Sequence, residues 1–139
     1  MSRLYTNVKE IDWAWLAGII DGEGCITIVK QIQNNCVSYG CRIIIGNNSM
    51  EMLNKISLIT GKKIIGKKKQ KYIAITKQTE IAYILKQVLQ YLTSKHEQAV
   101  LMLEYLDLRA NHKLFGYRIY DGYSEKELKV IELLGGLKD

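Results

Sequence analysis

The sequence predicts an α+β domain with a mostly antiparallel sheet, and two observations lead to this class. Segments that alternate like β-strands come in adjacent pairs joined by short polar turns, as in antiparallel hairpins. Segments with helical spacing precede, separate and follow these pairs, but no strand is joined to the next by a single crossover helix, which disfavours a doubly wound parallel sheet. The predicted order is helix, hairpin, helix, hairpin, helix, helix and a C-terminal addition.

Composition and charge bound the function class. The chain has 139 residues, 47% hydrophobic and 24% charged, which predicts one globular domain over residues 1–139. No proline occurs, and no Ser/Gly-rich linker divides the chain. Twenty Lys and Arg against fourteen Asp and Glu give a net charge of +6, which favours a polyanionic partner, nucleic acid first.

Several classes are disfavoured. The N-terminus is polar, so no signal peptide is expected, and the longest apolar stretch, residues 11–20, is too short to span a membrane. Cys25, Cys36 and Cys41 are odd in number and lack a CxxC spacing, which disfavours a zinc site or a disulfide framework. We therefore expect an intracellular protein, in the cytoplasm or an organelle, that is neither secreted nor bound to a membrane.

The first predicted helix runs from Trp13 to Asp21. Asp12 has the side chain of a helix N-cap, and Gly22 and Gly24 are expected to end the helix.

A hairpin follows. Residues 25–33 alternate isoleucines with mostly polar residues, and residues 38–46 alternate in the same way. Asn34 and Asn35 lie between these two segments and indicate a turn.

The remaining elements are predicted by the same rules. Asn48 with Glu51 resembles a capping box for a helix ending near Gly61. Further on we expect a hairpin over 62–76, turning near Lys69 and Gln70, and then a helix over 78–92. A capping box at Ser94 predicts another helix, which ends at about Arg109 and is followed by an irregular segment over 110–123. A capping box at Ser124 predicts the last helix, which ends at Gly135 and Gly136.

The first helix carries two stripes. Ala14, Gly18 and Gly22 lie at i, i+4 and i+8, and glycine inside a helix costs about 0.5–1 kcal/mol relative to alanine. A small stripe lets two helix backbones approach closely, either within this chain or with a partner. The other stripe suits the protein's own core: Trp13, Leu16, Ala17 and Ile20.

Two acids lie at the end of this helix. Asp21 and Glu23 stand where the helix dipole is negative, so a carboxylate there favours a nearby cation. Glu23 lies between two glycines, where backbone can approach a ligand, and oxygen ligands suit Mg²⁺ and Mn²⁺. The alternative is a solvated acidic turn.

Residues 16–24 read LAGIIDGEG, which resembles the signature of the LAGLIDADG homing endonucleases and is identical to it at six of nine positions. The resemblance covers about the first 110 residues and implies the family's αββαββα fold, with an antiparallel saddle-shaped sheet and C-terminal helices. One copy is present, because Phe115–Gly122 lacks the motif's start and its final acid. It therefore implies the homodimeric branch, with Ala14, Gly18 and Gly22 at the dimer interface.

The resemblance also implies an activity: a site-specific, intron-encoded endonuclease that makes a double-strand break in a long pseudo-palindromic DNA target. Glu23 would ligate Mg²⁺, or Mn²⁺ in its place, helped by the Gly22 carbonyl, and Asp21 would have a supporting role. Asn47 matches the residue that orients the attacking water, and Lys95 matches a basic residue beside the active site. The family's second basic residue, expected in the helix after Asn47, is replaced by Met50-Glu51-Met52.

The hairpins would bind double-stranded DNA, because a two-stranded ribbon fits the major groove. On the first hairpin the family's strand parity favours Thr27, Gln31, Gln33, Ser38 and Arg42, with Tyr39 at the start of the second strand. Residues 62–77 hold seven lysines and no acid, of which Lys67, Lys69 and Lys71 are expected to contact phosphates.

Three alternatives remain open. In the first, the chain is an RNA-splicing maturase of the same family, with RNA as its partner. In the second, it is a non-catalytic DNA-binding protein of the same fold. The third is a basic ribosome-associated α+β domain. Glu23 favours the nuclease over the other family members, because a maturase or a regulator need not keep a catalytic acid.

Overall fold

The computed structural model describes residues 7–114 and 122–137 and confirms the α+β class. The weak second motif over 115–122 lies, except for its last residue, outside the described residues. The elements, in chain order, are α1 (Glu10–Glu23), β1 (Gly24–Gln33), β2 (Cys36–Gly46), α2 (Met50–Thr60), β3 (Tyr72–Ile75), α3 (Gln78–Val88), the 3-10 turn η2 (Leu89–Tyr91), α4 (His96–Leu114) and α5 (Glu125–Gly136).

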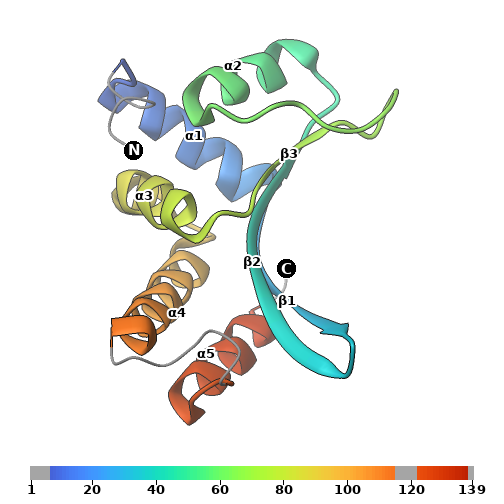
Figure 1. The fold of residues 1–139 in the computed structure, drawn as a ribbon. Coiled ribbons are helices and arrows are strands. Elements are labelled where there is room, and N and C mark those ends of the chain that lie inside the picture. The colour runs from blue at the N-terminus through green and yellow to red at the C-terminus, as the bar shows by residue number, and fades with distance from the viewer. Residues whose placement is uncertain (1–6, 115–121, 138–139) are drawn as a thin grey trace.

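The three strands form one antiparallel sheet in the order β1-β2-β3. The helices gather on one side of this curved sheet, and its other face is uncovered (Figure 1). The register places Ile43 of β2 opposite Ile26 of β1 and Ile75 of β3, and all three are buried against the helices. The predicted core stripe of α1 is buried in the same cluster: Trp13, Leu16, Ala17 and Ile20.

The first hairpin is confirmed, and its strands are slightly longer than predicted. Asn34 and Asn35 have φ of 52° and 65°, the left-handed conformation that a two-residue hairpin turn requires and that asparagine tolerates. Ile32 alternates in step with the buried Ile26 but is 70% exposed, because the tip of the hairpin extends beyond the helices (Figure 1).

The second hairpin, predicted over 62–76, is only partly formed. β3 is its one strand within the described residues, and the expected partner strand is reduced to a single bridge between Ile65 and Tyr72. Gly66, with φ of 105°, breaks the extended backbone after this bridge, and the turn follows at Lys68 and Lys69. The crowded lysines supply no alternating apolar side chains that could hold a fourth strand on the core.

Three helix ends differ from the prediction because a neighbouring residue supplies the cap. α1 is capped at Lys9, and Asp12 is its third residue, whose carboxylate accepts the Lys9 backbone N–H at 3.1 Å. α1 also continues through Gly22 to Glu23. The cap of α2 is Ser49, not Asn48, and its hydroxyl accepts the Met52 N–H at 3.3 Å.

The later helices follow the prediction in part. The helix expected over 78–92 divides into α3 and η2, and α4 continues to Leu114, beyond Arg109 and into the segment expected to be irregular. Ser124 caps α5 as predicted, within a capping box that includes Glu127.

The C-terminal helix α5 is joined to α4 by a buried ion pair. Arg109 of α4 lies 3.0 Å from Glu127 of α5, and these side chains are 3% and 1% exposed. Burial raises the pKa of Glu127, but hydrogen bonds from Ser124 and Arg109 outweigh it and hold that pKa below its usual value. The Tyr123 hydroxyl accepts the Tyr39 backbone N–H at 2.9 Å, so Tyr39 faces the helices rather than the open face.

Within the described residues, no helix is both long enough and apolar enough to cross a membrane.

Candidate active site

The passage from α1 into β1 is tight, and this fixes where Glu23 lies. A Cβ on Gly24 would lie 2.9 Å from the backbone Cα and O of Ile20, closer than real contacts allow. Only glycine therefore lets the strand begin directly where the helix ends. Glu23, the last residue of α1, is exposed at this junction.

The carboxylate of Asp21 accepts hydrogen bonds from backbone at the start of α4. Thr93 donates its N–H at 2.8 Å to Oδ2, and Lys95 donates its N–H at 2.9 Å to Oδ1. The start of a helix carries positive partial charge, so it offsets the unfavourable position of Asp21 at the end of α1. Asp21 thus joins the two helices.

Ser94 and Lys95 take part in the same junction. The Ser94 hydroxyl donates to the Asp21 carbonyl at 3.1 Å and to Oδ1 at 3.3 Å. The capping box predicted at Ser94 is not formed, because α4 begins two residues later, at His96, and the Ser94 side chain bonds to Asp21 instead. Lys95 Nζ donates to the same carbonyl at 3.2 Å, and the residue is 8% exposed. This ammonium compensates the negative end of α1.

Glu23 has a different environment. Within the described residues its hydrogen-bond partner is Asn47 at the end of β2, whose Nδ2 donates to Oε2 of Glu23. The Oδ1 of Asn47 accepts the Ser49 N–H at 2.8 Å, which turns the amide nitrogen toward the carboxylate. The structure thus brings together two of the three predicted catalytic residues.

Glu23 and Asn47 line an open pocket of about 490 Å³ on the uncovered side of the sheet. Lys69 and Lys71 line it as well, so residues of both charge signs border a space that is open to solvent. The other lining residues come from the ends of β2 and β3 and the segments beside them: Ile44, Gly46, Asn48, Gln70 and Tyr72.

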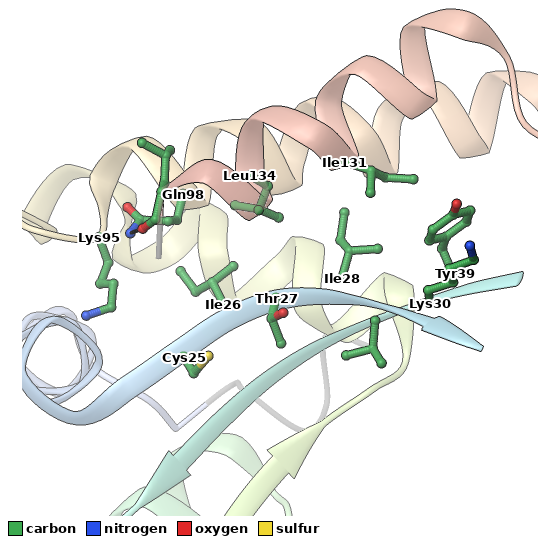
Figure 2. Close-up of a pocket in the computed structure, with 13 residues that line it drawn as sticks. Cys25, Ile26, Thr27, Ile28, Lys30, Tyr39, Lys95, Gln98, Ile131 and Leu134 are labelled. Atoms are coloured by element: carbon green, nitrogen blue, oxygen red, sulfur yellow. Dashed lines mark hydrogen bonds between the residues drawn. The ribbon is translucent and has the colours of Figure 1, made fainter. Parts of the chain in front are cut away.

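Lys95 does not line this pocket. It lies with Gln98 at one end of a groove of about 580 Å³ between β1 and α5, on the helix side of the sheet (Figure 2). Ile26 and Ile28 of β1 point into this groove toward Ile131 and Leu134 of α5, whereas Thr27 points to the opposite side. The catalytic role predicted for Lys95 stays a prediction, and its observed contact is with the end of α1.

The donor atoms at the end of α1 fit a hard divalent cation only in part. Glu23 offers an exposed carboxylate, and the Gly22 carbonyl lies in the last turn of α1, where backbone oxygens lack an intrahelical donor. No group of three or more His, Cys, Asp or Glu side chains within the described residues could hold a metal ion. Mg²⁺ often takes one or two carboxylates and completes its shell with water and substrate phosphate, which this donor set allows.

The residues predicted to bind DNA on the first hairpin share the uncovered face of the sheet. The register pairs Thr27 with Arg42 and Gln31 with Ser38, and directly opposed residues of an antiparallel pair lie on one face. Gln33 follows at the hairpin end, opposite Cys36. The three predicted lysines lie at the other end of the sheet, before β3: Lys67, Lys69 and Lys71.

The small stripe of α1 faces outward. Gly18 and Gly22 are exposed, and a Cβ on either would meet no atom of the described residues within 4 Å. Among the described residues, no internal helix packs on this stripe that would explain these glycines. Ala14 lies partly exposed on the same stripe, and Ile11, three residues earlier, is 74% exposed.

Two features of the site were missed by reasoning from sequence. The Asp21 contacts join residues 72 to 74 positions apart, and only the hydrogen-bonding residues around Ser94 hint at them. The pocket also includes Tyr72, which the register places opposite Gly46, directly before Asn47. A correct strand alignment would have found Tyr72.

Comparison with known proteins agrees with this geometry. A family model described as LAGLIDADG endonuclease matches residues 16–112. Among solved structures, the chain is similar to the homing endonuclease I-CvuI in complex with its target in the presence of Ca, with a TM-score of 0.75 and 22% identity, over 94% of this chain and 83% of that one. It is also similar to the archaeal intron-encoded homing endonuclease I-Vdi141I complexed with DNA, with a TM-score of 0.75 and 15% identity, over 94% and 86%.

A third similar structure is the LAGLIDADG homing endonuclease I-GzeII in complex with its DNA target. Its TM-score is 0.66 at 16% identity, and the match covers 91% of this chain but 43% of that one. No curated protein sequence matches the chain. At these identities the structural matches establish the fold.

Replacing Asp21 and replacing Glu23, the two acids of the motif, should change the free energy of unfolding by different amounts. Replacing Asp21 with Ala leaves the N–H groups of Thr93 and Lys95 without their acceptor, and we expect a loss of about 1–3 kcal/mol in the free energy of unfolding. Glu23→Ala, which removes an exposed side chain, should change it by less than about 0.5 kcal/mol. Urea unfolding at one protein concentration measures both, and equal losses would contradict the assignment.

Proposed function

The chain belongs to the LAGLIDADG endonuclease family, and from this premise we propose that it is a homodimeric homing endonuclease. It would make a divalent-metal-dependent double-strand break in a long, roughly palindromic DNA target. The observation that carries the proposal is the environment of Glu23. The chain offsets the charge of Asp21 with α4 but leaves the Glu23 carboxylate exposed at the negative end of α1, in a pocket open on the uncovered face.

A metal ion is expected at Glu23, with the Gly22 carbonyl as a second ligand. When bound, Mg²⁺ would lower the pKa of an attacking water and stabilise charge on the phosphate. I-CvuI has been crystallised with DNA in the presence of Ca and of Mg, which supports a divalent cation here.

The chain's own residues would prepare this site. The hydrogen bond from Asn47 fixes the orientation of the Glu23 carboxylate, and Ser49 fixes the orientation of Asn47. The lysines at the pocket rim would attract the phosphate backbone by charge. Asn47 already donates a hydrogen bond to the Glu23 carboxylate, so it would also contact a water molecule bound beside that carboxylate.

The uncovered face of the first hairpin would read the DNA. A ten-residue strand such as β1 spans about 33 Å, which matches roughly ten base pairs. Thr27, Gln31, Ser38 and Arg42 carry donors and acceptors on this face, and Arg favours guanine where Gln favours adenine. Each chain would thus read one half of the target.

A second chain would cover the α1 stripe. The described part of the single chain gives no packing reason for Gly18 or Gly22, although glycine costs about 0.5–1 kcal/mol in a helix. A partner α1 packed there would bring both Glu23 residues to the base of the helix pair. Coverage of the solved structures supports this reading, because the chain spans most of I-CvuI but less than half of I-GzeII.

Replacing Gly18 with Leu should yield a folded monomer, because a Cβ there meets no described residue of the same chain while the longer side chain would block close approach of a second α1. The control is Gly135→Leu in α5, where a Cβ also meets nothing. Sedimentation equilibrium gives the mass of each variant. A Gly18→Leu dimer as stable as the control would refute the proposed interface.

Cleavage tests the activity directly. We expect the wild-type protein with Mg²⁺ to linearise a member of a plasmid library carrying randomised target sites, and sequencing of the cut ends identifies that site. Glu23→Gln should bind the identified site with the wild-type dissociation constant but lose at least about 100-fold in cleavage rate, since it removes the charged metal ligand. The nuclease proposal fails if the wild-type protein cuts no member of the library.

A further inference from the structure

Lys71 occupies a place that α2 leaves without a basic side chain. The first turn of α2, directly after Asn47 and its cap, contains Met50, Glu51 and Met52. Lys71, from the segment before β3, extends to this turn, and its Nζ lies 3.5 Å from Sδ of Met50. A positive charge thus lies over the start of α2 although α2 supplies none there.

The position of Lys71 relative to the site is fixed by backbone contacts. The Asn47 N–H donates to the Lys71 carbonyl at 3.4 Å, and the next pair in the register is Gly46 with Tyr72. Lys71 is therefore held beside the residue that contacts Glu23. Its side chain is partly buried, whereas Lys67 and Lys69 are exposed.

The Lys71 ammonium has no acidic partner among the described residues. The thioether of Met50 is neutral and a weak acceptor, so it leaves the charge uncompensated. Lys62 in the same lysine-rich segment differs, because it forms an ion pair with Glu80 at 2.5 Å. A lysine that lines the Glu23 pocket and has no acidic partner among the described residues fits a phosphate group better than a structural role.

We propose that Lys71 contacts the phosphate that is cleaved beside Glu23, as the basic residue that α2 lacks. This inference rests on the proposed nuclease function. In the reaction, an oxygen of water bonds to phosphorus while the bond to the leaving sugar oxygen breaks. The water loses a proton and the leaving oxygen gains one. Lys71 transfers no atom; its charge stabilises the negative charge that grows on the phosphate oxygens in the transition state.

The proposed role of Lys71 differs from that of the other lysines in the quantity that its loss should change, either the cleavage rate or the DNA affinity. A lysine that contacts the DNA backbone away from the cleaved bond contributes to affinity equally before and during the reaction. A lysine at the reacting phosphate contributes more in the transition state. Loss of Lys71 should therefore lower the cleavage rate of bound DNA, whereas loss of a distant lysine should weaken binding alone.

The test compares three proteins with the wild type, on the site identified from the randomised library. Lys71→Met removes the charge at similar length. Lys63→Met is the control, because it removes an exposed lysine of the same segment that does not line the pocket. The double variant Lys71→Met/Met50→Lys returns the charge from the adjacent side chain and restores the wild-type net charge. Single-turnover cleavage by saturating protein, the dissociation constant in Ca²⁺ and the melting temperature are measured for each.

We expect Lys71→Met to lose about 100-fold in the single-turnover rate, the size of one transition-state contact, with a dissociation constant close to that of Lys63→Met. The double variant should recover most of the rate, and melting temperatures should be equal throughout. Lys71→Met cleaving at the Lys63→Met rate, or a double variant no faster than Lys71→Met, would overturn the inference while leaving the nuclease intact. A wild-type protein that cuts nothing would instead remove the proposed function, and this inference with it.

Discussion

The end of α1 is held to the start of α4 by one carboxylate, and the geometry of the candidate site depends on this contact. Asp21 accepts two backbone N–H groups there, and its own carbonyl accepts the Ser94 hydroxyl and the Lys95 ammonium. The contact joins the negative end of one helix to the positive end of another. Because the chain then turns at Gly24 directly into β1, the position of Glu23 relative to the sheet is determined as well.

The same arrangement leaves two features of the single chain without a counterpart among the described residues. Glu23 is the single acid in its pocket, and the outward stripe of α1 has no partner among the described residues. A second copy packed on α1 across a two-fold axis, as proposed, would supply both counterparts. Two chains would also carry a charge of +12, twice the +6 of one, toward the DNA phosphates.

The sequence predicted what short-range patterns determine. Alternation placed Thr27 and Arg42 on one face, and the nine-residue motif placed Glu23 at a helix end. Contacts between distant segments were not predictable in this way. The partners of Asp21 lie more than 70 residues away in the sequence, and Lys71 contacts Met50, which lies 21 positions earlier. The lysine-rich hairpin was predicted with two full strands, but only one of them forms. A run of lysines does not indicate whether a strand has an apolar face that it can bury.

The central claim is that each of two chains supplies one Glu23 and cuts one DNA strand. A mixed dimer of one wild-type chain and one Glu23→Gln chain, isolated with two different affinity tags, tests this on a supercoiled plasmid carrying the target. If the claim is right, the mixed dimer nicks the plasmid to the open circular form and yields almost no linear DNA. Linear product formed at the wild-type rate would contradict it, since one intact Glu23 would then suffice for both strands.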